Sequence, residues 1–185
     1  MELYKALSRL LDYPEKALQE HLDEVRTLIE DSGTLSPDER RGLQALADWI
    51  SMHRLIEVQA LYVQTFDVTP EHSLHLTHHV FGESRERGPA LVDLSEHYKA
   101  GGLDARTGEL PDYLPLVLEY LSTLDDFQAR LFLHGMVEVL EALAGRLEAL
   151  HNPYAPVFRV LSHRGRLGNP ADPAESDRAA RLAGG

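Results

Sequence analysis

The sequence predicts an all-α protein, a single-domain helical bundle of roughly six to eight helices. Apolar residues recur at helical spacing along most of the chain, as Leu3, Leu7 and Leu11 do, and no segment alternates convincingly at period two. A chain of 185 residues with 43% apolar residues can bury one sizeable core. We therefore expect one helical domain over residues 1–163. Residues 164–185, rich in Gly, Pro, Ala and charge, are expected to form a mobile tail.

The first two helices are expected near the N-terminus. An apolar stripe covers residues 3–11 and stops before Pro14, because the residue that precedes a proline avoids helical backbone angles. Residues 15–30 carry a second apolar face of leucine, valine and isoleucine, which ends before Gly33. These patterns predict two helices that each bury one face.

A capping sequence opens the third helix. Ser36 stands where an N-cap side chain accepts a backbone hydrogen bond, Pro37 fits the first helical position, and Glu39 can complete a capping box. The apolar face then continues from Leu43 to Phe66. We expect one long helix over this stretch.

Proline and glycine delimit the next two helices. Thr69 and Pro70 can cap and open a histidine-rich helix, which Gly82 closes. Ser84 opens another helix, which ends at the glycine pair that begins at Gly101. These breaks predict two helices in the middle of the chain.

The last two expected helices lie between residues 111 and 150. Pro111 can occupy the first turn of one helix. Residues 125–150 form the clearest helix of the chain, with Phe127 and Leu131 among the residues of a broad apolar face. We therefore expect both side chains to be buried.

Composition disfavours several classes of function. The net charge is −12 and the acidic excess lies in residues 1–150, so phosphate backbones and anionic lipid would be repelled and a basic partner attracted. The alternative interpretation is that the acidic residues only keep the protein soluble. Cysteine is absent, which removes disulfides, thiolate nucleophiles and cysteine-ligated iron–sulfur clusters.

Neither a membrane span nor a signal peptide is predicted. The chain has no run of about eighteen uncharged apolar residues, and Glu2 and Lys5 interrupt its first leucines. We expect a soluble, cytoplasmic protein that neither binds nucleic acid nor inserts into the membrane.

Four histidines gather at His72, His75, His78 and His79. The last three share a helical face, where imidazoles can bind one metal ion. A di-iron bundle needs two Glu-x-x-His helices, and this chain has that spacing once, at residues 148–151. One alternative is a groove wall or buried polar contacts for His75 and His79, with His72 and His78 as surface histidines without a role. The other is the metal site of a small metal-dependent helical-bundle enzyme.

Tyr62 and Phe66 share one helix face, and the plainest interpretation is that both are core residues. Asp67 follows them and would need a partner if it were buried. Arg85 and Arg87 are the candidate partners for an ion pair. A role in recognition and a structural ion pair both remain open for this group.

Acidic residues flank the helix that follows Pro111. Glu109, Asp112 and Glu119 are either a solvated face or the carboxylate rim of a groove that accepts an amphipathic peptide helix carrying Lys or Arg. No P-loop, G-x-S-x-G elbow, H-E-x-x-H helix or glycine-rich dinucleotide turn is present. We therefore expect a binding protein and not an enzyme, and a helical adaptor for some unrelated basic partner is a further alternative.

Four motifs stand in order along most of residues 1–163. They are Leu3-Tyr4-Lys5-x-Leu7-Ser8-x-Leu10-Leu11-x-Tyr13-Pro14, Tyr62-x-x-x-Phe66-Asp67, His75-Leu76-x-x-His79-Val80-x-Gly82-x-Ser84-Arg85-x-Arg87-Gly88 and Glu109-Leu110-Pro111-Asp112-Tyr113-Leu114-Pro115. Together they resemble the NarJ family, the assembly chaperones of respiratory nitrate reductase, within the wider TorD/DmsD group of redox-enzyme maturation chaperones. In that wider group a Glu-x-Pro-Asp-His signature resembles the last motif, and here Tyr113 stands at the histidine position.

The resemblance implies a TorD/NarJ-like helical fold and a non-catalytic chaperone for nitrate reductase assembly. The partner would be the N-terminal segment of the catalytic (alpha) subunit, held while the molybdenum cofactor is inserted, which delays membrane attachment of the immature enzyme. No cofactor is expected to stay bound, and transient contact with the molybdenum cofactor or with the proteins that synthesise it remains open. The residues expected to bind the partner peptide are Tyr62, Phe66, Asp67, His75, His79, Arg85, Arg87, Glu109, Asp112, Tyr113 and Glu119.

Overall fold

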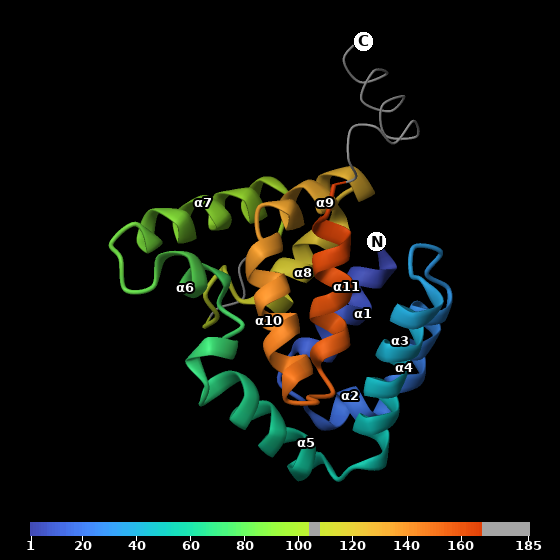
Figure 1. Ribbon diagram of the computed structural model, residues 1–185. Helices are drawn as coiled ribbons and strands as arrows, with labels where there is room; N and C mark the ends of the chain where they lie inside the picture. The colour runs from blue at the N-terminus through green and yellow to red at the C-terminus, as the bar shows by residue number, and fades with distance from the viewer. Residues whose placement is uncertain (104–107, 168–185) are drawn as a thin grey trace.

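The computed structural model describes residues 1–103 and 108–167. Within these residues the named secondary-structure elements are all helices (Figure 1). This confirms the predicted all-α fold. In addition, Val63–Asp67 form a π-helical turn and Pro70–His72 a 3-10 turn. The α-helices are α1 (Glu2–Leu11), α2 (Lys16–Glu20), α3 (Leu22–Glu30), α4 (Pro37–Met52), α5 (Leu55–Tyr62), α6 (Leu76–Phe81), α7 (Arg87–Ala100), α8 (Leu114–Thr123), α9 (Asp126–His134), α10 (Val137–Ala149) and α11 (Ala155–Gly165).

Two helix pairs form the centre of the bundle. The hairpin of α10 and α11 is one pair, and α1 with α8, which are distant in sequence, is the other. The Ser8 hydroxyl on α1 donates to the Pro115 carbonyl on α8 at 2.8 Å. Around this centre, α9 packs against α11, while α3 and α4 pair with each other and contact α1 and α11 respectively. The N- and C-terminal parts of the chain therefore share one core.

Aromatic side chains join the middle of the chain to its end. Tyr62 and Phe66 are buried, with ring centroids 5.0 Å apart, and Phe66 lies 5.2 Å from Tyr154. Phe158 on α11 completes the cluster. Tyr62 and Phe66 are thus core residues, as their helical spacing allows.

The expected helix over residues 15–30 is divided. His21 adopts φ −115° and ψ 18°, which separates α2 from α3. The expected long helix to Phe66 also breaks, because His53 and Arg54 are extended. The amide of Gln19 donates to the carbonyls of Ile50 and His53 at 2.9 Å each. This side chain satisfies backbone acceptors that a continuous helix would have used internally.

The structure confirms the predicted capping box at the start of α4. The Ser36 hydroxyl accepts from the Glu39 backbone N–H, and the Glu39 carboxylate accepts from the Ser36 backbone N–H at 2.8 Å. His163 on α11 also contacts Glu39 at 3.0 Å. Burial alone would raise the pKa of Glu39, but the bonds from Ser36 and His163 outweigh it and lower the pKa. The cap thus stabilises both α4 and its contact with α11.

The prediction of one helix over residues 125–150, with Phe127 and Leu131 buried, is wrong in two respects. It breaks at Gly135 into α9 and α10, and the side chains of Phe127 and Leu131 are exposed, at 55% and 51%. The opposite face of α9 is buried instead, through Ala129 and Leu133. Because α9 packs across the end of α11, this contact and not the periodicity decides which face is buried.

Two further boundaries differ from expectation. Pro111 precedes α8, whose first turn contains Pro115. At the other end of the chain, α11 continues to Gly165, where a Cβ atom would lie only 2.8 Å from the Leu133 carbonyl oxygen. A glycine therefore allows this close approach. Beyond residue 167, the expected tail lies outside the described residues.

With these breaks the chain forms eleven α-helices in the part that the structure describes, more than the expected six to eight. None of the described helices is long and apolar enough to cross a membrane.

Candidate functional site

A short antiparallel bridge joins the histidine segment to the acidic segment. His75 pairs with Tyr113 across the bridge. The Leu76 N–H donates to the Asp112 carbonyl at 3.1 Å, and the Leu114 N–H donates to the Leu74 carbonyl at 2.9 Å. Two of the four sequence motifs therefore meet in one place, although about forty residues separate them in the chain.

Asp112 is the centre of this junction. Its side chain is 0% exposed, and its carboxylate lies 3.0 Å from His75 Nδ1 and 3.4 Å from Arg87 Nη2. It also accepts from the backbone N–H of Thr77 at 3.1 Å and from the Thr77 hydroxyl. Burial would raise the pKa of Asp112, but the hydrogen bonds from His75 and Thr77, with the charge of Arg87, hold the pKa below its ordinary value. The carboxylate stays ionised and ties α6 to α7.

This arrangement corrects two expectations. Asp112 cannot form part of an exposed groove rim, because its side chain is fully enclosed. Arg87 pairs with Asp112 and not with Asp67, which is exposed. Arg85 is exposed as well and forms no ion pair with Asp67. The reason is the chain topology: the bridge between His75 and Tyr113 places Asp112 next to Arg87.

Tyrosines connect the junction to the core. The Tyr62 hydroxyl donates to the Leu11 carbonyl at 2.9 Å and lies 2.8 Å from the Tyr113 hydroxyl. The Tyr113 hydroxyl lies 3.4 Å from Asp12, and its ring centroid is 5.6 Å from that of His75. Burial raises the pKa of both Tyr62 and Tyr113, so both stay neutral hydrogen-bonding groups at physiological pH.

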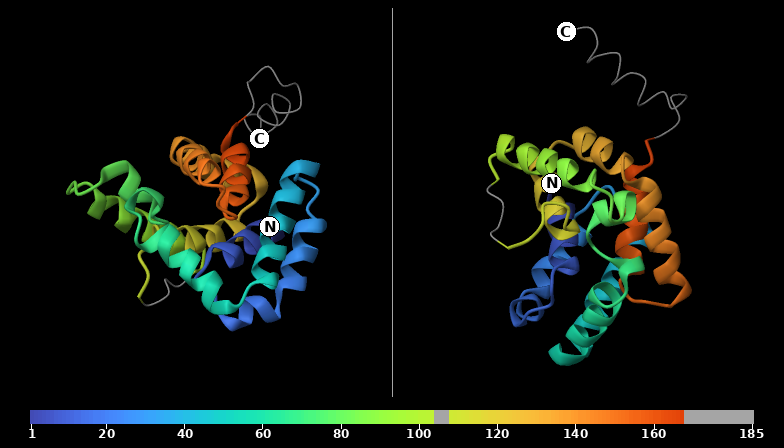
Figure 2. Two further views of the ribbon diagram at one scale, coloured as in Figure 1. Left: turned by 60° about the horizontal axis from the view of Figure 1, so that its bottom comes forward. Right: turned by 90° about the vertical axis from the view of Figure 1, so that its left-hand side faces the viewer.

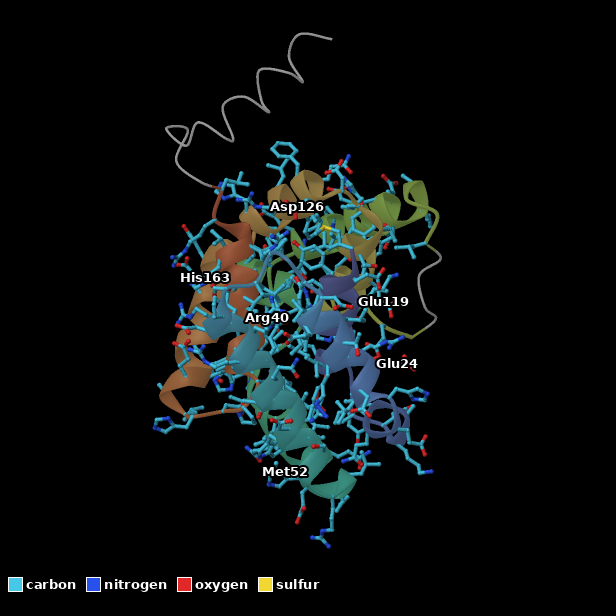
Figure 3. All side chains as sticks on the ribbon, turned by 90° about the vertical axis from the view of Figure 1, so that its right-hand side faces the viewer. Glu24, Arg40, Met52, Glu119, Asp126 and His163 are labelled. Atoms are coloured by element: carbon cyan, nitrogen blue, oxygen red, sulfur yellow. The ribbon has the colours of Figure 1, made fainter. Side chains whose placement is uncertain are left out.

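An acidic groove opens beside these tyrosines. Its larger cavity, about 700 Å³, is lined by apolar Tyr13, Ala17, Leu18 and Val25 and by the charged or titratable residues Arg9, Asp12, Glu15, His21, Glu24 and Glu109. A smaller cavity of about 30 Å³ is lined by Asp12, Glu109, Tyr113, Pro115, Leu116 and Glu119. Because the two cavities share Asp12 and Glu109, we treat them as one acidic groove. Figure 3 shows Glu24 and Glu119, one from each cavity, on the same edge of the molecule.

The expected site residues separate into three groups. Glu109, Tyr113 and Glu119 line the acidic groove. A second group lies in the core or in the hydrogen-bonded junction behind the groove: Tyr62, Phe66, His75, Arg87 and Asp112. The remaining residues, Asp67, His79 and Arg85, do not line either cavity.

Sequence reasoning missed most of the groove lining. Tyr13, Leu18 and Val25 come from α2, α3 and the connection before them, which the sequence indicated only as helices with a buried face. The motif that ends in Tyr13-Pro14 was the one sequence feature that could have indicated this part of the groove. Its exposed tyrosine packs edge-on against Tyr62, with ring centroids 5.6 Å apart.

The histidines do not converge on one point. His75 contacts Asp112, whereas His79 Nε2 donates to the Ser73 carbonyl at 2.8 Å. Among the described residues, no three His, Cys, Asp or Glu side chains are placed to hold one metal ion.

Fold and site together define an all-α protein in which a buried carboxylate network supports an acidic groove. Residues 33–159 match the family described as nitrate reductase delta subunit, and the chain belongs to this family. This confirms the resemblance to the NarJ chaperones.

The curated relatives carry names of the same kind. The nitrate reductase molybdenum cofactor assembly chaperone NarJ of Escherichia coli (strain K12) is 38% identical over 155 residues, which cover 84% of this chain and 66% of that protein. A probable chaperone of the same name from Bacillus subtilis (strain 168) is 32% identical over 161 residues, 85% of each chain. The chain thus spans slightly less than two thirds of the Escherichia coli protein.

Proposed function

We propose that this chain is an assembly chaperone for respiratory nitrate reductase. In this proposal it binds the N-terminal segment of the catalytic subunit in the cytoplasm, assists insertion of the molybdenum cofactor and delays membrane attachment of the immature enzyme. The names of its relatives support this class, and we assign the chain no catalytic step of its own. The observation that carries the proposal is the acidic groove.

The lining of the groove suits an amphipathic peptide with basic residues. Tyr13, Ala17 and Leu18 offer apolar surface, which can provide most of the affinity for a segment that orders on binding. Carboxylates outnumber the arginine among the lining residues and would orient Lys or Arg side chains of the peptide. The groove volume, about 700 Å³, accommodates a few side chains and not a folded domain.

The buried junction supports the groove from behind. Tyr113 lines the smaller cavity and also contacts Tyr62 and His75. His75 in turn contacts Asp112, which holds Arg87. We infer that the signature residues position the groove wall, and that Glu109, Tyr113 and Glu119 contact the peptide.

Calorimetric titration with a synthetic peptide from the N-terminus of the partner catalytic subunit tests this proposal. We expect selective one-to-one binding, and no binding of a scrambled peptide of the same composition. The double variant Glu15→Gln with Glu109→Gln removes two groove charges. It should weaken binding by a few-fold to about tenfold, since an exposed ion pair contributes about 1 kcal/mol or less.

A matched control keeps the change in total charge constant. Glu83→Gln with Glu86→Gln removes two exposed carboxylates near the start of α7, outside the groove lining. This pair should leave the affinity unchanged. Equal weakening by both pairs would show that total charge and not the groove attracts the peptide. A folded wild-type protein that fails to bind the peptide would remove the proposed function.

A further inference from the structure

The hydroxyl groups of Tyr62 and Tyr113 form a hydrogen-bonded pair between the core and the acidic groove. The pair begins at the carbonyl of Leu11, which ends α1 and, like the last carbonyls of any helix, has no partner within that helix. The buried Tyr62 hydroxyl donates to this carbonyl at 2.9 Å, and the Tyr113 hydroxyl lies 2.8 Å from the Tyr62 hydroxyl. Tyr113 also lines the smaller cavity of the groove, so the pair ends where a ligand can reach it.

The packing of α1 against α8 holds the hydroxyl pair in place. Asp12 directly follows α1, Tyr113 directly precedes α8, and the two helices lie side by side (Figure 2). The Ser8 hydroxyl donates to the Pro115 carbonyl at 2.8 Å, which fixes the end of α1 beside the start of α8. The Tyr113 hydroxyl therefore lies 3.4 Å from Asp12 Oδ1, and both residues line the smaller cavity.

Each tyrosine hydroxyl has a single proton, which fixes the direction of the two hydrogen bonds. The Tyr62 proton is donated to the Leu11 carbonyl, so the Tyr62 oxygen accepts the proton of Tyr113. The reverse direction would take the donor from a buried carbonyl and replace it by the contact of 3.4 Å between Tyr113 and Asp12, which is long for an O–H···O bond. Tyr113 therefore presents acceptor lone pairs, and no proton, to the groove.

The smaller cavity fits the head group of a lysine side chain. Its volume, about 30 Å³, holds one group of the size of a water molecule, and an ammonium group is of that size, whereas a planar guanidinium is larger. Pro115 and Leu116 provide apolar lining for the aliphatic stem. The carboxylates of Asp12, Glu109 and Glu119 also line the cavity and favour a positive charge. The size of the cavity thus selects lysine over arginine.

We propose that this cavity binds the ammonium group of one lysine of the partner peptide, and that the Tyr113 hydroxyl accepts a hydrogen bond from it. Tyr62 is a positioning residue, because its oxygen keeps the Tyr113 proton turned away from the ligand. An ammonium group has three N–H donors and no acceptor, so it pairs with an oxygen that offers lone pairs alone. The inference rests on the proposed peptide binding and names the side chain that the groove selects.

Peptide variants test the selection of lysine. The probe is the N-terminal peptide of the catalytic subunit, synthesised with each basic residue in turn as lysine, as arginine or as norleucine, which keeps the lysine stem without its charge. Calorimetric titration should find one position where lysine binds several-fold more tightly than arginine. At this position norleucine should bind about tenfold more weakly than lysine, as expected for the loss of a hydrogen bond to a charged group. If no position prefers lysine to arginine, the lysine site is excluded.

Protein variants test the role of the two hydroxyls. Tyr113→Phe removes the acceptor, so it should weaken binding of the lysine peptide about tenfold and leave the affinity of the norleucine peptide unchanged. Tyr62→Phe should act in the same direction, because the released Tyr113 proton turns toward Asp12 and the ligand. The two substitutions combined should weaken binding no more than Tyr113→Phe alone. Equal losses for the lysine and norleucine peptides would overturn the proposal, since both hydroxyls would then act on the fold alone.

Tyr154→Phe is the matched control. Tyr154 is buried against Tyr62, with ring centroids 6.1 Å apart, and its hydroxyl is the one buried side-chain group in the described part of the chain that lacks a hydrogen-bond partner. Its loss should leave the affinity of both peptides unchanged. Thermal denaturation checks that each variant is folded, and Tyr113→Phe decides the outcome if Tyr62→Phe does not fold. A folded wild type that binds no peptide would instead remove the proposed function itself.

Discussion

Asp112 illustrates how a single residue combines burial with charge. It is fully enclosed, yet it accepts hydrogen bonds from His75, Thr77 and Arg87. A buried carboxylate is tolerated only when such donors replace water. The sequence indicated that Asp112 belongs to a signature, but placed it on an exposed rim. In the structure Asp112 is instead enclosed and contacts His75, which lies beside Tyr113 of the groove lining.

Replacement of Asp112 should therefore lower stability. We expect Asp112→Asn to reduce the free energy of unfolding by about 2–3 kcal/mol at pH 7, because the charged acceptor of the network is lost. The folded-state pKa of Asp112 lies below its ordinary value of 3.8, so its contribution is present above that value and is lost as the pH falls through the folded-state pKa. Urea denaturation at pH 7 and at pH 3 measures both effects.

The exposed pair of Asp38 and Arg41 provides the comparison for this experiment. Asp38→Asn should change the free energy of unfolding by less than about 0.5 kcal/mol. If Asp112→Asn proved as harmless as this control, or if its effect persisted undiminished at pH 3, the ionised network would not be the source of the stability.

At the scale of elements, local chemistry and tertiary packing decide different things. The capping box at Ser36 formed as predicted because all of its atoms lie within one helical turn. The buried face of α9 was predicted wrongly because apolar residues occur on more than one side of this helix. Phe127 and Leu131 point outward, whereas Leu133 faces α11. Periodicity cannot rank two apolar faces until the neighbouring helix is known.

Two leucines on α9 test this assignment of faces. Leu131→Ala should change the free energy of unfolding by less than about 0.5 kcal/mol, since most surface substitutions have small effects. Leu133→Ala should cost about 2–5 kcal/mol, because it leaves a cavity against α11. Thermal or urea denaturation of both variants measures the difference. Similar losses in the two variants, or the larger loss in Leu131→Ala, would contradict the packing of α9.

At the scale of the whole molecule, the acidic charge acts together with the shape of the groove. The net charge of −12 creates a field that attracts basic segments from any direction. In the proposed binding of the peptide, the groove would then provide apolar contacts that only a segment of suitable pattern can use. Steering by charge and selection by apolar contacts would therefore be separate steps that depend differently on salt.

The association rate of the peptide should fall as the salt concentration rises from low to physiological levels, because exposed charges are screened over about 8–10 Å. Stopped-flow measurement with a fluorescent peptide gives this rate. The double variant Glu15→Gln with Glu109→Gln should show a flatter salt dependence than the wild type. An association rate that does not change with salt would remove steering from the proposed mechanism.

The sequence by itself determined the helical class, the capped start of α4, the acidic character and the family. These properties depend on composition, on hydrogen bonds within one turn, or on motif order along the chain. Only the tertiary structure decided that Asp112 is buried, that Arg87 pairs with it, and that Tyr13 and Glu109 share a groove. Each of these depends on contacts between elements distant in sequence, which no local pattern specifies.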